Sequence, residues 1–77
     1  MTQLEKLIER IKARPPEADF EDVERLLEAY GWEKKRQSGS HVAYRKGKGD
    51  GTITFPLVGG RRVKRVYLDR IIEKLGI

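Results

Sequence analysis

The spacing of apolar residues changes twice along this chain, and these changes restrict the fold that it can adopt. Over residues 2–14 and 20–30, apolar side chains recur at the 3.6-residue spacing of a helix. Alternating segments follow near residues 32–37, 41–46 and 52–55, and helical spacing returns over residues 66–75. The predicted order is therefore α-α-β-β-β-α. A chain of 77 residues is expected to form one α+β domain, with helices on one face of a three-stranded antiparallel sheet and a ligand surface on the other.

Capping residues mark the ends of the predicted helices. Thr2 is expected to cap the first helix, which ends before Pro15 and Pro16. Asp19 is expected to cap the second helix, and Gly31 to end it. The first helix has a narrow apolar stripe, so it is either a packing element or an arm that binds a partner chain.

The first predicted strand carries a weak alternation. Its pattern predicts Trp32, Lys34 and Arg36 on one side. The other side is then formed by Glu33, Lys35 and Gln37. The glycine-rich residues 47–51 lack a phosphate-loop pattern and are predicted to be a hairpin loop.

Charge divides the chain into an acidic and a basic part. Residues 1–30 contain five Lys and Arg against eight Asp and Glu, whereas residues 31–77 contain twelve against four. A basic part of this kind indicates a surface that meets phosphates, although solubilising charge is the simpler alternative. The absence of cysteine excludes thiol catalysis, disulfides and cysteine-based zinc sites. No apolar run has the length of a membrane span, so we expect a soluble, cytoplasmic protein.

His41 is the only histidine, and it follows a Ser38-Gly39-Ser40 turn at the start of a predicted strand. An imidazole can exchange a proton near neutral pH, which suits acid–base catalysis. A lone histidine at such a position is nevertheless more often an ordinary surface residue. Ser40 is expected to form the turn, and Tyr44 to pack in the core rather than stack on a base.

These elements together resemble the HicA (YcfA-like) toxin family. The resemblance is carried by Gly39-Ser40-His41 with Tyr44 three residues on, by Ile53-Thr54-Phe55-Pro56, and by Val63-Lys64 before a helix with Leu68, Ile71 and Ile72. It covers about residues 20–77. The chain is thus expected to be a single HicA-like domain, with residues 1–16 as an N-terminal extension helix and residues 19–77 as the core.

The resemblance implies a fold similar to a double-stranded RNA-binding domain, cleavage of mRNA without a metal or other cofactor, and a HicB-like antitoxin partner. It makes His41 the catalytic residue, with Gly39 and Ser40 as its motif neighbours. Many relatives place a second histidine in the loop after Pro56, where this chain has Leu57 followed by Val58-Gly59-Gly60. A scheme with two histidines is therefore not available here.

The residue types fit this chemistry. RNA carries its own nucleophile, the 2′-hydroxyl, so His41 is expected either to remove that proton or to protonate the leaving oxygen. Basic side chains are candidates to hold phosphate oxygens. These are Arg36, Arg45, Lys46, Arg61, Arg62, Lys64 and Arg65. Two other functions fit the same sequence: a noncatalytic RNA-binding module, and a protein-interaction domain with an acidic partner.

Overall fold

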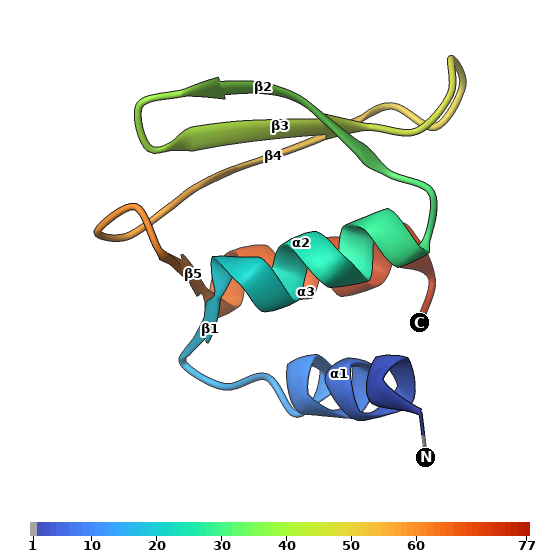
Figure 1. The fold of residues 1–77 in the computed structure, drawn as a ribbon, viewed down its shortest axis with the longest axis vertical. Helices are drawn as coiled ribbons and strands as arrows, with labels where there is room; N and C mark the ends of the chain where they lie inside the picture. Colours follow the sequence, from blue (N-terminus) through green and yellow to red (C-terminus); the bar gives the residue numbers. More distant parts are fainter. Residues whose placement is uncertain (1) are drawn as a thin grey trace.

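The computed structural model describes residues 2–77 as a stack of three layers (Figure 1). A three-stranded sheet forms the first layer, two helices the second, and the N-terminal helix the third. The elements are α1 (Gln3–Lys12), β1 (Glu17–Asp19), α2 (Phe20–Ala29), β2 (Glu33–Ser38), β3 (His41–Arg45), β4 (Thr52–Pro56), β5 (Arg62–Lys64) and α3 (Arg65–Leu75). No helix within residues 2–77 has the length and hydropathy needed to cross a membrane.

Strands β2, β3 and β4 form an antiparallel sheet with β3 in the middle. On its covered face, Val42 is paired with Phe55 and Tyr44 with Ile53, and all four side chains are buried. Helices α2 and α3 pack against this face with their own apolar stripes, which join the same core. The predicted α+β class, with helices on one face of an antiparallel sheet, is therefore confirmed.

The chain also contains a two-stranded ribbon that the sequence analysis did not predict. Strands β1 and β5 pair antiparallel, with Ala18 opposite Val63, and both of these side chains are buried. At one end of the ribbon, Asp19 Oδ1 accepts a 2.8 Å bond from Arg62 Nη1. Asp19 is at the N-cap position of α2, but its side chain makes no capping hydrogen bond. The predicted N-cap residue is therefore confirmed, while its carboxylate binds Arg62 rather than the first turn of the helix.

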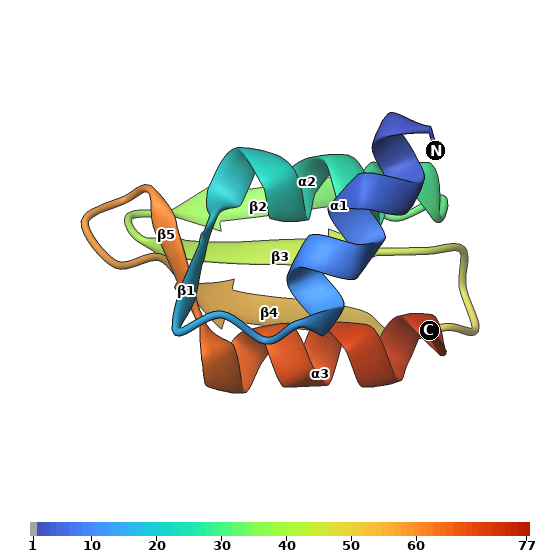
Figure 2. The ribbon, with the colours of Figure 1, turned by 90° about the horizontal axis from the view of Figure 1, so that it is seen from below.

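Helix α1 is a packing element of this fold. The predicted cap is present, since the Thr2 hydroxyl accepts from the backbone of Glu5 at 3.1 Å. Leu7 and Ile11 are buried in the core. Arg10 also forms an ion pair with Asp22 of α2 at 3.0 Å. Seen from below, α1 lies across the space between α2 and α3 (Figure 2). Of the two alternatives for this helix, the contacts favour packing.

Tyr44 joins the sheet to α2. Its side chain is buried and its ring stacks on Phe55, with centroids 6.0 Å apart. Its hydroxyl donates a 3.1 Å hydrogen bond to Glu24 Oε2. Burial, together with the negative charge of Glu24, raises the pKa of Tyr44 above its ordinary value of 10. Tyr44 is thus a core residue, as its alternation with small Ala43 predicted.

This environment makes stability at high pH depend on Tyr44. Since the pKa of Tyr44 is higher in the folded chain than in the unfolded chain, its contribution is fully present below pH 10 and is lost as the pH rises further. We expect the unfolding free energy of the parent to fall more steeply above pH 10 than that of Tyr44→Phe, by up to about 1.4 kcal/mol per pH unit. Urea unfolding of both proteins at a series of pH values measures this difference. Equal slopes would show that the phenol ionises freely in the fold.

Candidate functional site

His41 is the first residue of β3, and it faces the side of the sheet that the helices leave uncovered. Along β3, Val42 and Tyr44 are buried, Ala43 is half-buried, and His41 and Arg45 are exposed. Residues paired directly across an antiparallel sheet point to the same side, so the register defines this surface, which we call the open face. The open face consists of Glu33, Arg36, Ser38, His41, Ala43, Arg45, Thr52, Thr54 and Pro56.

A β-bulge at Lys35 brings Arg36 to the open face. The register of β2 passes from Lys34 opposite Tyr44 to Arg36 opposite Ala43, so Lys35 has no residue of β3 opposite it. An inserted residue shifts the alternation of side chains along a strand by one. The predicted alternation, with Lys34 and Arg36 on the same side, is therefore wrong. Lys34 is on the side of buried Tyr44, whereas Arg36 shares the open face with His41.

Two polar side chains of the open face are diagonal neighbours of His41. His41 is paired with Ser38 of β2 and with Pro56 of β4. Arg36 and Thr54 each lie two residues further along these strands on the same face. Diagonal neighbours have their Cα atoms about 7–8 Å apart, with the Cβ atoms somewhat closer. The side chain of Arg36 is therefore long enough to reach the space above the imidazole.

The turn that precedes His41 is fastened to the loop after β4. Gly39 has a φ of +60°, a conformation that glycine adopts without strain and that suits the tight turn between β2 and β3. The carbonyl of Ser40 accepts a 2.6 Å hydrogen bond from the backbone of Leu57. In the loop after β4, Leu57 is buried and Val58 is exposed. The two motif neighbours thus form a turn held next to the loop after β4.

Arg45 and Lys46 lie at the opposite end of β3 from His41. Arg45 is on the open face four residues further along the strand, which corresponds to about 13 Å at 3.3 Å per residue. Lys46 follows it, and its side chain runs beside Gly31. Both side chains are exposed. Of the seven basic candidates, the structure therefore brings Arg36 close to His41 and puts Arg45 and Lys46 at a distance along the same strand.

The other four basic candidates belong to the β1–β5 ribbon and its flanks. Arg61 is exposed in the turn before β5, and its carbonyl accepts a hydrogen bond from Phe20 at 2.8 Å. Arg62 pairs with Asp19 at 2.8 Å and with Glu17 at 3.6 Å. Lys64 is the N-cap residue of α3. Arg65 begins α3, and its Nε donates to the carbonyl of Pro15 at 3.4 Å. These four residues are not part of the open face.

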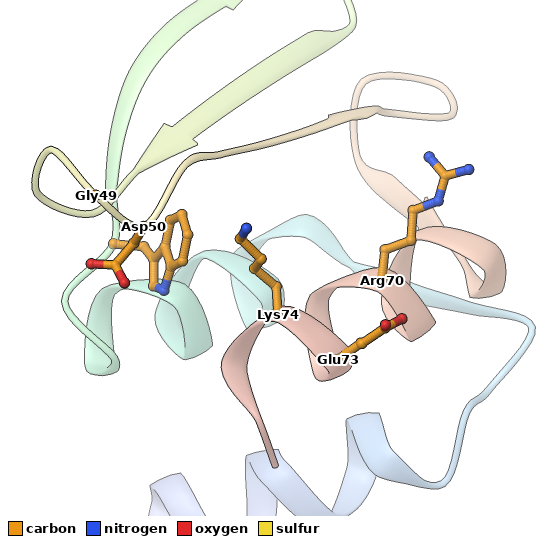
Figure 3. Close-up of a pocket in the computed structure, with 6 residues that line it drawn as sticks. Gly49, Asp50, Arg70, Glu73 and Lys74 are labelled. Atoms are coloured by element: carbon orange, nitrogen blue, oxygen red, sulfur yellow. The ribbon is translucent and has the colours of Figure 1, made fainter.

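A hollow on the helix side of the β3–β4 hairpin loop has no net charge (Figure 3). Its basic side chains, Arg70 and Lys74, rise from α3 on the same side as the hairpin. Asp50 and Glu73 line it as well and balance them. Trp32 forms part of its wall but is only 3% exposed, so its ring face is not accessible for stacking.

One comparison with known proteins identifies the family of this chain. Residues 20–77 match the family model described as the HicA toxin of bacterial toxin–antitoxin systems. The matched region begins with α2 and includes His41, the whole sheet and α3, whereas α1 and β1 precede it. No curated protein and no solved structure matched the chain. This family implies a toxin–antitoxin system with an antitoxin partner. This chain therefore belongs to the HicA toxin family.

Proposed function

We propose that this toxin is an endoribonuclease that cleaves mRNA without a metal, with His41 as its general acid or base. The observation that supports this most is the position of the imidazole. His41 is exposed on the open face, with the guanidinium-bearing Arg36 as its diagonal neighbour. An acid–base group beside a phosphate-binding group is the minimum arrangement for cleavage by the 2′-hydroxyl of RNA itself.

In the proposed reaction, the 2′-oxygen attacks the adjacent phosphorus and the bond to the 5′-oxygen of the next nucleotide breaks. His41 either takes the proton from the 2′-hydroxyl or gives one to the departing 5′-oxygen, and water carries the other proton. Arg36 donates hydrogen bonds to the phosphate oxygens, where negative charge accumulates in the transition state. The products are a 2′,3′-cyclic phosphate and a 5′-hydroxyl.

The other basic candidates are expected to contribute unequally to RNA binding. Arg45 shares the open face with His41 and is exposed, so it can hold a phosphate further along the strand. Arg61 is exposed as well. The charge of Arg62 is offset by Asp19 and Glu17, and its contribution is expected to be the smallest. The antitoxin is proposed to be HicB-like and to block the reaction by covering the edge of the sheet or the open face around His41.

A single 2′-deoxy substitution separates an endoribonuclease from a noncatalytic RNA-binding module. We expect an oligonucleotide that lacks only the 2′-hydroxyl at the cleavage position to remain intact at that position. Its affinity for the protein should stay within about threefold of the parent RNA, because phosphates dominate binding. Gel analysis of the products and fluorescence anisotropy measure the two quantities. Binding of unmodified RNA without cleavage would support the module instead, and cleavage at the deoxy position would exclude the 2′-hydroxyl as nucleophile.

A further inference from the structure

The open face has a second basic region at the end of β3 that is distant from His41. A hollow there is lined by Gly31, Glu33, Lys35, Arg45, Gly47 and Lys48. Three of these residues are cationic and one is anionic, so the hollow is positively charged. This distinguishes it from the hollow between the hairpin and α3, where two acids balance two bases. The charge and the concave shape together fit an anionic ligand.

The local backbone builds this hollow. The bulge in β2 places Lys35 where its Nζ binds Glu33 Oε2 at 2.8 Å, and this hydrogen bond lowers the pKa of Glu33. Gly31 has a φ of +87°, and a Cβ at this position would lie 3.4 Å from Cε of Lys46. This left-handed backbone favours glycine, and a Cβ here would make ordinary contact with the Lys46 side chain. Lys35 offsets the negative charge of Glu33 with one of its three N–H groups and can donate the others to a phosphate, and within residues 2–77 Arg45 and Lys48 form no ion pair.

The hollow and His41 are connected by a surface of small side chains. Arg45 belongs to the hollow and lies about 13 Å from His41 along β3. Ala43 lies between them on the open face, with Thr54 opposite it on β4. Neither side chain is large enough to obstruct an extended strand of RNA. A strand that presents one phosphate at His41 and Arg36 can therefore continue along β3 into the hollow.

We propose that this hollow is a second phosphate-binding site, which holds the RNA backbone a few nucleotides away from the bond cleaved at His41. The inference rests on the proposed function, since it takes RNA as the substrate. It assigns a role in binding to Lys35 and Lys48, which neither the motif nor the charge count of the sequence singled out. An acidic segment of a protein could also meet positive charge, but the continuity of the hollow with the face that carries His41 favours RNA. A toxin with two such sites binds an oligonucleotide much more tightly than a dinucleotide.

The test uses the double variant Lys35→Ala/Lys48→Ala and fluorescently labelled RNA analogues with 2′-deoxy riboses, which cannot be cleaved through the 2′-hydroxyl. We expect the affinity for an octanucleotide to fall about tenfold at low salt. The dependence of log K on log salt concentration should become shallower by about one unit, as expected when phosphate contacts are lost. The ratio of octanucleotide affinity to dinucleotide affinity should also be lower in the double variant than in the parent protein. Fluorescence anisotropy at several salt concentrations measures all three quantities.

The matched control is Lys6→Ala/Lys12→Ala, which removes the same charge from exposed positions of α1, in the layer farthest from the sheet. A comparable loss in this control would attribute the effect to net charge and would overturn the proposal. An unchanged octanucleotide affinity in Lys35→Ala/Lys48→Ala would also overturn the proposal. The hollow would then not bind RNA, and an acidic protein segment would be the better candidate for its ligand. If the protein is not an endoribonuclease, the parent will not cleave unmodified RNA at all. This result differs from the loss of the second phosphate site alone, in which the parent still cleaves.

Discussion

His41→Ala is expected to lower the rate of RNA cleavage about a hundredfold to ten-thousandfold, the range over which a single acid–base group contributes to catalysis. The affinity for uncleavable RNA should change little, since the basic side chains remain in place. Stability should change by no more than about 0.5 kcal/mol, because His41 is exposed and is not part of the core. This combination of lost rate, retained binding and retained fold is specific to a catalytic residue.

Single-turnover cleavage of a labelled RNA measures this effect, with thermal unfolding and RNA binding recorded on the same preparations. Glu9→Ala is the control, because Glu9 is exposed on α1, remote from the sheet. It should cleave at the parental rate, and a contaminating ribonuclease would appear equally in both variants. Should His41→Ala also retain the parental rate, the histidine has no catalytic part and the open face is only a binding surface.

Phe55→Ala is expected to have the largest effect on stability, a loss of about 3–5 kcal/mol. Phe55 is 1% exposed, stacks on Tyr44 and meets the ring of Phe20 edge-on, with centroids 6.1 Å apart. Removing its ring leaves a cavity between the sheet and α2. Natural domains are stable by only about 5–15 kcal/mol in total, so this loss removes a large share of the stability of a chain this short.

Urea unfolding followed by circular dichroism measures this loss. Val66→Ala provides the control, since Val66 is apolar but 52% exposed at the start of α3, and its truncation should cost less than about 0.5 kcal/mol. If Phe55→Ala lost no more stability than Val66→Ala, the three aromatic rings would not be the centre of the core.

The elements with strong local signals were predictable from the sequence. The helical stripes and Gly76, which ends α3 with a φ of +72°, are read directly from spacing and residue type. The burial of Tyr44 followed from its alternation with small Ala43 in β3. In each case the information lies within a few neighbouring residues, so the sequence alone is sufficient.

The remaining features depend on contacts between distant segments. Strands β1 and β5 are three residues long and have only Ala18 and Val63 as buried apolar residues, too few to produce a periodic pattern. The pairing of Asp19 with Arg62 joins residues 43 positions apart. It could not be predicted from the sequence, so Asp19 was assigned to capping and Arg62 to phosphate binding.

The candidate site was predictable only in part, for the same reason. The turn and the position of His41 at the start of a strand are local features, and the structure has both. The bulge at Lys35 is set by how β2 pairs with β3, and no residue type in β2 marks it. The predicted alternation therefore grouped Arg36 with Lys34, although Arg36 was already a candidate to hold phosphate near His41. The register of the sheet puts Arg36 and His41 on one face.

Product analysis of one defined RNA, cut in excess chelator by the parent protein and by His41→Ala, tests the central claim most directly. Cleavage by the 2′-hydroxyl with His41 as proton carrier predicts 2′,3′-cyclic phosphate and 5′-hydroxyl ends with the parent, and almost no product with the variant. Products with 5′-phosphate ends, a parent protein that is inactive until magnesium is restored, or equal product from both proteins would contradict it.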